Sequence, residues 1–293
     1  MGKLPKIRKC VQAGFALLQN AHLQGFFTGR IYAGGLKRFC VPGMNCYACP
    51  AATGACPMGG LQALLGGRRA KPGLWVLGFL AAVGILVGRF VCGWFCLFGL
   101  IQELLYKIPV KKLRGPRRAD RVLRYVKYFV LMVFVVLLPL LLRDASGSGD
   151  PWFCKYLCPV GVLEGALPLM LLDRALRAAA GWLFAWKFAV LGAVLVLSVF
   201  LHRPFCRYLC PLGAFYALFQ RFSLLQLRLD ADKCLRCGKC AGVCPMGVDP
   251  RKTPNAAECI RCGGCADGCP AGALSFRFLR SFEKDGPHER EKD

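Results

Sequence analysis

Two cysteine runs near the C-terminal end of this chain have the residue type and the spacing of a metal-binding site. Residues 234–245 and 259–270 both follow the pattern C-x2-C-x2-C-x3-C-P. Cysteine thiolates are ligands that soft and borderline metal ions prefer. Glycines between the cysteines of both runs allow the backbone to wrap closely around an inorganic group. The pattern therefore predicts that both runs bind metal.

The same spacing is found where two [4Fe-4S] clusters lie side by side, each held by three thiolates of one run and the fourth of the other. We expect one cluster on Cys234, Cys237, Cys240 and Cys269. We expect the second cluster on Cys259, Cys262, Cys265 and Cys244. Structural zinc also uses C-x2-C pairs, but the duplicated run with both prolines favours clusters. A domain of this kind moves single electrons.

Cysteine motifs also repeat in the upstream part of the chain. FCKYLCPVG at 153–161 and FCRYLCPLG at 205–213 are nearly identical, VCGWFCLFG at 91–99 is a third copy, and residues 46–59 hold a degenerate fourth. Cysteines four residues apart lie on one face of a helix, with Cβ atoms about 5–6 Å apart. Each such pair presents two thiolates to one centre, so two pairs are needed for a complete site.

The composition places these motifs in a membrane domain. The chain is 56% hydrophobic and 19% charged, with a mean hydropathy of +0.44, which is more apolar than an ordinary soluble domain. A helix that crosses a bilayer needs about 20 mostly apolar residues. The expected spans are residues 11–27, 74–95, 128–142 and 183–201, and the first is the weakest because it contains several polar side chains. Each expected span is followed by a cysteine motif.

Lys and Arg side chains crowd residues 107–127, between the second and third expected spans. The positive-inside rule assigns such a short basic loop to the cytoplasm. Residues 28–72 and 143–181 then lie outside, and the C-terminal cysteine runs lie in the cytoplasm. This topology accounts for the net charge of +24 without a nucleic-acid partner. We find no cleavable signal peptide, so we expect the first span to be retained.

This topology sorts the upstream cysteines into two groups. The inner site, at the cytoplasmic end, is expected to contain Cys92, Cys96, Cys206 and Cys210. The outer site, on the opposite face, is expected to draw its ligands from Cys46, Cys49, Cys56, Cys154 and Cys158. Iron–sulfur clusters are the favoured occupants, and disulfides are the alternative for the outer group if its compartment is oxidising. Cys10 and Cys40 have no partner at ligand spacing.

Arg89 and Arg203 each stand three residues before the first cysteine of an inner pair. A cation beside a cluster with thiolate ligands raises its reduction potential. We therefore expect both arginines to contact the bound cofactor. The alternative is that both side chains extend to the membrane interface.

At these residues the chain resembles the NapH/NosR-type membrane polyferredoxins, the family of 4Fe-4S-binding quinol dehydrogenase membrane components. The resemblance covers the four expected spans, the two inner cysteine pairs and the double cysteine run. It implies a quinol dehydrogenase or electron-relay subunit that works with partner redox proteins. The outer cysteine group goes beyond the NapH pattern.

The predicted fold is an α-helical membrane protein of about four transmembrane helices with a C-terminal α+β two-cluster ferredoxin-like domain. We assign residues 1–229 to the membrane domain, 230–276 to the ferredoxin domain and 277–293 to a polar tail. The protein is expected in the inner (cytoplasmic) membrane, where it crosses the lipid several times. The expected cofactors are two [4Fe-4S] clusters in the ferredoxin domain, one or two further clusters in the membrane domain, and a quinone.

Two functions remain open from the sequence. The first is electron relay between the ferredoxin domain and the outer face, in exchange with redox partner proteins and quinone. The second is a redox assembly or regulatory role in which electrons serve the maturation of a copper or flavin metalloenzyme. Met44 and Met58 motivate it, because thioethers suit Cu(I). No catalytic acid, base or nucleophile constellation emerges, so the cofactors would carry the chemistry of this electron-transfer subunit.

Overall fold

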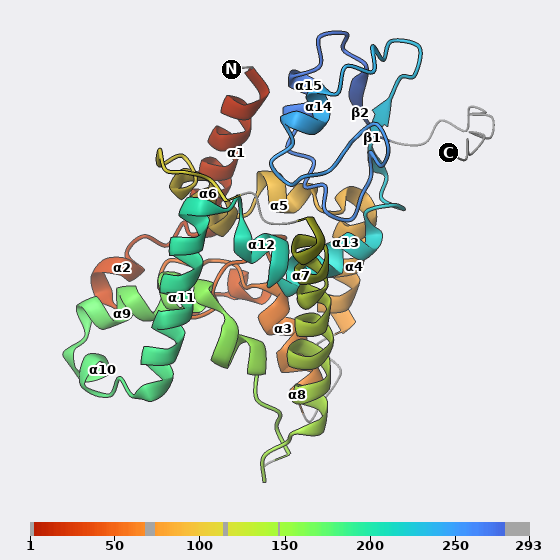
Figure 1. Ribbon diagram of the computed structural model, residues 1–293. Helices are drawn as coiled ribbons and strands as arrows, with labels where there is room; N and C mark the ends of the chain where they lie inside the picture. Colours follow the sequence, from red (N-terminus) through yellow and green to blue (C-terminus); the bar gives the residue numbers. More distant parts are fainter. Residues whose placement is uncertain (1–2, 68–73, 114–116, 146, 279–293) are drawn as a thin grey trace.

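The computed structural model describes residues 3–67, 74–113, 117–145 and 147–278. Most of the predicted polar tail lies outside the described residues. Helices dominate the chain, and a small two-stranded unit stands at one end of the helical body (Figure 1). The N-terminal helix α1 runs along one side and points its first residues toward that unit.

The second and fourth repeats share one plan: a long helix, a break, a short helix with the first cysteine, and a return helix after the second cysteine. The second repeat comprises α4 (Leu74–Val87), α5 (Phe90–Trp94) and α6 (Leu97–Leu105). The fourth comprises α11 (Trp182–Phe200), α12 (Pro204–Tyr208) and α13 (Pro211–Phe219). Pro211 begins α13, as suits a residue with no N–H to donate.

The third repeat has the same plan with irregular helices. Its long helix is built from α7 (Arg117–Val130), the π-helical turn η2 (Leu131–Leu137) and α8 (Leu138–Leu141). The motif and return segments are η3 (Phe153–Leu157), η4 (Gly161–Ala166) and α9 (Leu167–Leu172), followed by α10 (Arg174–Ala178). The degenerate first repeat contains α1 (Lys3–Gln19), α2 (Gly25–Thr28), the 3-10 turn η1 (Gly35–Arg38) and α3 (Pro57–Gly66).

In the described part of the chain, two helices are long and apolar enough to cross a membrane, Ala119–Leu141 and Trp182–Phe200. The expected span at 74–95 is not continuous, because Gly88 takes a left-handed backbone (φ 53°) that ends α4 at Val87. The expected span at 11–27 is broken after Gln19, where α1 ends. Among the described residues the structure thus supports two spans, and the expected four are not confirmed.

The C-terminal unit has the fold expected of a small ferredoxin. Strands β1 (Leu225–Leu229) and β2 (Leu274–Phe278) pair antiparallel, with Leu225 opposite Phe278. Between them the chain forms two matching loops with the short helices α14 (Lys239–Gly242) and α15 (Gly264–Asp267). This unit rests on the end of the helical body formed by α5 and α13 (Figure 1).

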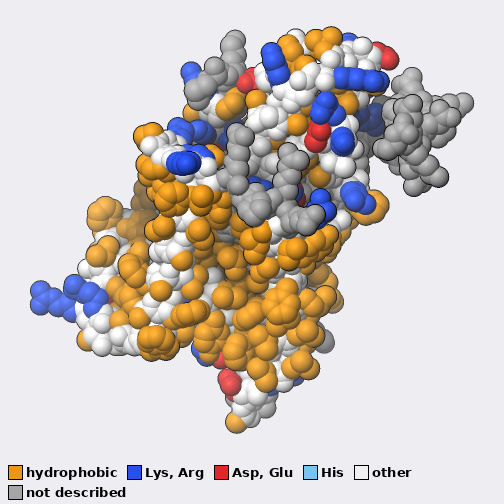
Figure 2. Space-filling view, in the orientation of Figure 1, with side chains coloured by type: hydrophobic (Ala, Val, Ile, Leu, Met, Phe, Trp, Pro, Cys, Tyr) orange, Lys and Arg blue, Asp and Glu red, His pale blue; other side chains and the backbone are white. Residues whose placement is uncertain are grey.

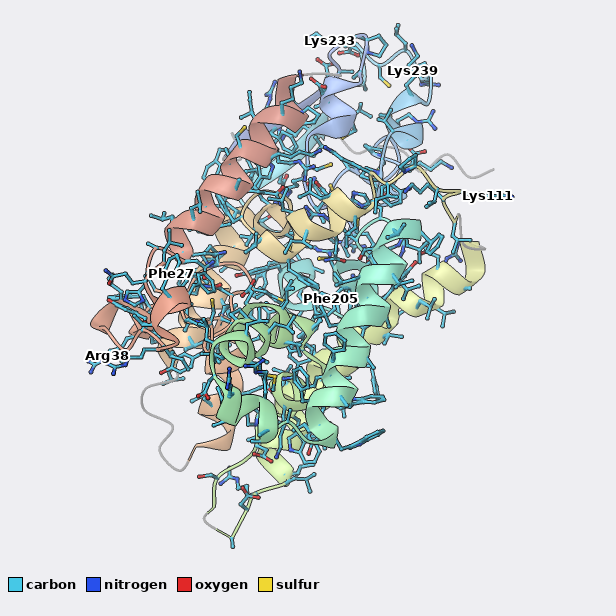
Figure 3. All side chains as sticks on the ribbon, turned by 90° about the vertical axis from the view of Figure 1, so that its left-hand side faces the viewer. Phe27, Arg38, Lys111, Phe205, Lys233 and Lys239 are labelled. Carbon is cyan, nitrogen blue, oxygen red and sulfur yellow. The ribbon has the colours of Figure 1, made fainter. Side chains whose placement is uncertain are left out.

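Hydrophobic side chains cover most of the helical surface below the ferredoxin unit (Figure 2). Lys and Arg side chains gather toward the ferredoxin end, with a smaller group beside α10. Figure 3 shows Phe205, the neighbour of Cys206, inside the helical body, with Lys233 and Lys239 at the ferredoxin end and Phe27 and Arg38 far from them. The cysteine motifs of the inner repeats therefore lie between the ferredoxin unit and the apolar body.

Candidate iron–sulfur sites

Two cavities in the ferredoxin unit are each lined by four cysteines. Those of the first, which we call the distal site, are Cys234, Cys237, Cys240 and Cys269. Those of the second, which we call the proximal site, are Cys244, Cys259, Cys262 and Cys265. Each run therefore gives three thiols to one cavity and its fourth thiol to the other, which is the grouping expected from the spacing.

The backbone at both runs takes the same conformation. Arg236 and Arg261, which precede the second cysteine of each run, have φ angles of 51° and 50°. Gly238 and Gly263, which follow that cysteine, have φ angles of 74° and 81°. The left-handed region is costly for residues with a Cβ, so glycine is the suitable residue directly after the cysteine.

The inner site lies in the main hydrophobic core, where all four predicted thiols are buried. The four residues are Cys92, Cys96, Cys206 and Cys210. Burial raises the pKa of the Cys210 thiol well above its ordinary value, and the neighbouring Cys206, Cys92 and Cys96 thiols raise it further. The structure therefore brings the two C-x3-C pairs together in one buried cluster.

Arg89 and Arg203 cross over between the two inner repeats. Arg89 donates from Nη2 to the Cys206 carbonyl oxygen at 3.1 Å, and Arg203 donates from Nη1 to the Cys92 carbonyl oxygen. Both side chains are 0% exposed, unlike side chains that extend to the membrane interface. Each guanidinium thus ties its own repeat to the cysteine backbone of the opposite one.

Buried carboxylates neutralise these two arginines. Arg89 pairs with Glu258 at 3.2 Å, and Arg203 pairs with Glu103 at 2.9 Å. Glu103 also accepts two hydrogen bonds from Arg8 of α1, at 2.9 and 2.7 Å. Burial by itself raises the pKa of the Glu103 carboxyl, but Arg203, His202 and Arg8 outweigh it and lower the pKa below its ordinary value. Glu103 is therefore a charged link at neutral pH between α1 and the inner site.

The outer site surrounds a cavity of about 460 Å³. The cysteines that line it are Cys46, Cys56, Cys154 and Cys158. Cys49, the fifth candidate, is buried beside Cys46 but does not line the cavity, and its Sγ lies 3.7 Å from Oδ1 of Asn20. The structure therefore places four of the five outer candidates around the cavity and leaves the fifth outside its lining.

Different charged groups surround this outer cavity. Oε2 of the buried Glu164 accepts a hydrogen bond from the Cys46 backbone N–H at 2.8 Å. Burial raises the pKa of this carboxyl to about 7. Lys187 of α11 also lines the cavity. Cys40 is half-buried and Cys10 is exposed, and neither lines the cavity.

The donor sets fit iron–sulfur clusters. A [4Fe-4S] cube takes one thiolate at each of four corners, and each of the four groups supplies four thiols. Across the described ranges, no three His, Cys, Asp or Glu side chains are arranged to hold a single metal ion. All nineteen cysteines lie in the described ranges, and no disulfide joins any two of them.

Two functional candidates went unnoticed in the sequence: Gln62 and Gln102 each donate a side-chain hydrogen bond to a cysteine sulfur. The structure also places Met44, predicted only as a soft copper ligand, between the inner and outer sites. A signal for the glutamines exists, since each follows a motif cysteine, Cys56 or Cys96, by six residues. The location of Met44 between the two sites has no such signal, because only packing places it there.

Two family models for 4Fe-4S binding domains match this chain. The family described as "4Fe-4S binding domain" matches residues 72–116, 128–167 and 182–229. The family described as "4Fe-4S dicluster domain" matches residues 226–270. No solved structure matches the chain.

Several curated proteins are similar over the same region. The uncharacterized protein MJ0749 of Methanocaldococcus jannaschii is 32% identical over 69% of this chain and 70% of its own length. The putative electron transport protein YccM of Escherichia coli is 30% identical over 56% of this chain, and the regulatory protein NosR of Stutzerimonas stutzeri is 31% identical over 58%. The matches span 43% of YccM and 22% of NosR, less than half of either protein. The cysteine motifs and these relatives together show that the chain belongs to the NosR/NirI family of membrane-associated 4Fe-4S electron-transport proteins.

Proposed function

We propose that this protein is a membrane-bound relay that passes single electrons between the ferredoxin unit and the outer face of the membrane. The observation that carries this proposal is a continuous series of contacts between the proximal, inner and outer cysteine groups. When bound, each [4Fe-4S] cluster supplies a one-electron couple. The residues of the chain hold these groups in order and shield them from water.

The proximal and inner sites meet through their ligand loops. Trp94, between Cys92 and Cys96, donates from Nε1 to the carbonyl oxygen of Arg261 at 3.0 Å. A Cβ built on Gly93 would lie 2.3 Å from the carbonyl oxygen of Ile260, so glycine permits direct backbone contact. The loop that carries Cys259 and Cys262 therefore rests on the helix that carries Cys92.

One arginine from the membrane domain and one from the ferredoxin unit stabilise this junction. Arg89 donates from Nη1 to the carbonyl oxygen of Ala257 at 2.7 Å while its other nitrogen reaches the Cys206 backbone. Arg261 donates to the carbonyl oxygens of Val87 and Gln220, both at 2.9 Å, at the ends of α4 and α13. Helix C-terminal ends attract cations, so the ferredoxin unit is held in one position on the membrane domain.

The inner and outer sites meet through Met44. Its Sδ atom lies 3.5 Å from Sγ of Cys210, and the same residue lines the outer cavity. Met44 is 2% exposed, so this junction excludes water. A single side chain therefore separates an inner ligand from the space around the outer ligands.

The proposed ligands follow from the four groups. The distal and proximal sites each use their four cysteines, and the inner site uses both C-x3-C pairs. The outer site uses the four cysteines around its cavity and leaves Cys49 out, which is supported by the contact of Cys49 with Asn20. Arg89 and Arg203 would act on the inner cofactor indirectly, because they hydrogen-bond to the backbone carbonyl oxygens of its ligands Cys206 and Cys92.

The proposed topology keeps four membrane crossings and a cytoplasmic ferredoxin domain in the inner membrane. Two crossings are the long apolar helices, and the shorter apolar helix α4 and helix α1 would provide the others. The gathering of Lys and Arg toward the ferredoxin end supports a cytoplasmic location for that end (Figure 2). We also propose that the ferredoxin domain includes all of β1 and β2, so that it extends beyond the expected limits of 229/230 and 276/277 on both sides.

The outer cavity is the proposed place of electron exchange with a quinone or a redox partner protein. Leu169, Met170 and Leu176 line it beside the cysteines and Lys187. An apolar wall with few polar groups is typical of sites for small ligands. The cavity would therefore let an external redox group approach the outer ligands.

Iron and sulfide analysis with EPR tests this function. Anaerobically purified wild-type protein should contain about sixteen iron atoms, four for each of four clusters. Cys206→Ser should lose the inner EPR signal and Cys154→Ser the outer one, while both keep the two ferredoxin signals. A wild-type content of about eight iron atoms would contradict the proposal.

The alternative function in metalloenzyme maturation keeps one specific observation in its favour. Met44 and Met58 both line the outer cavity together with its cysteines, and such a set of soft sulfur ligands suits Cu(I). Anaerobic titration of the full-length protein with Cu(I) decides between the two. Stoichiometric binding that is lost in Met58→Leu would favour the maturation role.

A further inference from the structure

The geometry points to Gln62 and Gln102 as a matched pair of sulfur hydrogen-bond donors that raise the reduction potentials of the outer and inner sites, one glutamine for each site. This inference rests on the proposed function, because it requires a cluster in both sites. It concerns positioning residues, since the glutamines act on the ligand sulfurs rather than on any transferred group.

The amide of Gln102 in α6 makes three hydrogen bonds at the inner site. Its Nε2 atom donates to Sγ of Cys206 at 3.3 Å and to the carbonyl oxygen of Phe98 at 3.2 Å. Its Oε1 atom accepts from the backbone N–H of Phe205 at 3.2 Å. Gln102 is 0% exposed, so water does not compete for these bonds.

The amide of Gln62 in α3 makes the same three bonds at the outer site. Its Nε2 atom donates to Sγ of Cys154 at 3.2 Å and to the carbonyl oxygen of Met58 at 3.2 Å. Its Oε1 atom accepts from the backbone N–H of Phe153 at 2.9 Å. Gln62 is also 0% exposed. Two glutamines from different repeats thus make the same set of hydrogen bonds at two different cysteine pairs.

The surrounding bonds fix which end of each amide faces the sulfur. A backbone N–H can only donate, so the atom opposite Phe153 or Phe205 must be the amide oxygen. A backbone carbonyl can only accept, so the atom near Met58 or Phe98 must be the amide nitrogen. The nitrogen therefore faces Sγ in both sites, and the donor role follows from the fold.

The equivalent positions in the other two repeats hold no sulfur donor. Glu164 follows Cys158 by six residues and accepts from the Cys46 backbone N–H. Tyr216 follows Cys210 by six residues and donates to the carbonyl oxygen of Pro42 at 2.9 Å. Each site therefore receives one amide donor. In the outer site the first repeat donates to a cysteine of the third, and in the inner site the second repeat donates to a cysteine of the fourth.

An N–H bond to a ligand sulfur strengthens when the cluster gains an electron, because the sulfur then carries more negative charge. Such bonds are among the factors that set the reduction potential of a cluster. The effect is larger in a buried site of low dielectric. Loss of one donor should therefore make reduction harder at that site alone.

Redox titration followed by EPR on the full-length holoprotein tests this inference. Gln62→Leu should lower the equilibrium constant for reduction of the outer cluster about tenfold, which is a shift of about 59 mV for one electron. Gln102→Leu should do the same for the inner cluster. Gln62→Glu and Gln102→Glu retain an oxygen for the Phe N–H but place no N–H at the sulfur, so they should shift the same signals in the same direction.

Ser198→Ala is the matched control, because Ser198 is buried in α11 and bonds to the carbonyl oxygen of Val194 rather than to a cysteine. It should shift neither potential. Unchanged potentials in all four glutamine variants, with full iron content, would overturn the inference and leave the proposed relay standing. Absence of the inner and outer signals from wild-type protein would overturn the relay itself.

Discussion

The inner and outer sites share one scaffold and differ in what surrounds it. In both, a C-x3-C pair faces cysteines of another repeat, and a glutamine donates to the first cysteine of that pair. Around the inner site, two fully buried arginines bind the ligand backbones and pair with carboxylates. Around the outer site, Lys187 lines a cavity of about 460 Å³, and Glu164 accepts a hydrogen bond from the backbone N–H of Cys46.

One sequence position explains much of this difference. The residue three places before the first cysteine of the pair is Arg89 or Arg203 in the inner repeats, but Pro151 in the third repeat. An arginine there crosses to the opposite repeat and fills the space between them, whereas a proline has no side chain that can reach. The comparison shows that side chains enclose the inner site, whereas a cavity adjoins the outer site, and this difference supports the proposed roles of relay and exchange.

Replacement of one cysteine ligand should have the largest effect, a change in the rate of cluster reduction. The effect should differ between the inner and outer sites. When a reductant acts on the ferredoxin unit, Cys206→Ser should leave the outer cluster present but reduced at least about tenfold more slowly, because the path passes through the inner site. Cys154→Ser should leave reduction of the inner cluster at its normal rate. Rapid-freeze EPR measures both rates, and fast reduction of the outer cluster in Cys206→Ser would show a path that bypasses the inner site.

Loss of an inner arginine should have the next largest effect. Arg89→Ala should lower the free energy of unfolding by about 3 kcal/mol, the lower end of the cost of breaking a buried ion pair. The lower end applies because Lys127 still pairs with Glu258, at 2.6 Å. Lys187→Ala, which removes a cation beside the open outer cavity, should change stability by less than about 0.5 kcal/mol. Chemical unfolding in detergent compares the two, and equal losses would contradict the closed-versus-open distinction.

Replacement of two matched glycines by alanine should test how tightly the backbone packs at each site. Gly93→Ala at the inner site places a Cβ 2.3 Å from the Ile260 carbonyl oxygen, and we expect this clash to cost about 1–3 kcal/mol. Gly161→Ala at the outer site meets Nζ of Lys187 at 3.7 Å and Sγ of Cys46 at 3.8 Å, which are ordinary contacts. Limited proteolysis should release the ferredoxin unit faster in Gly93→Ala alone. Equal release from both variants would argue against tight docking at Gly93.

The smallest expected effect is a pH dependence that belongs to the inner site. The pKa of Glu103 is lower in the folded protein than its ordinary value of about 4.3. Its ionised form therefore stabilises the fold above that value, and this contribution is lost as the pH falls through the folded pKa. Glu103→Gln should be less stable at pH 7 and should lose stability less steeply on acidification. Unfolding midpoints at several pH values measure this, and parallel curves for both proteins would refute it.

The sequence by itself determined the local groups of thiols. The doubled run specified which cysteines share the distal and proximal cavities, because ligand spacing within a short loop leaves the backbone few alternatives. The C-x3-C pairs and the expected sides of the membrane grouped Cys92 and Cys96 with Cys206 and Cys210. The predicted family resemblance to NosR-type proteins is confirmed by the similar proteins.

Tertiary structure decided everything that depends on packing between repeats. It separates Cys49 from the outer cavity, places Met44 between two sites, and breaks the expected span 74–95 at Gly88. It also brings Gln62 and Gln102 to cysteines that are 92 and 104 residues away in the chain. Residue spacing along a helix specifies which side chains share a face, whereas the partner of that face is chosen only when the helices pack.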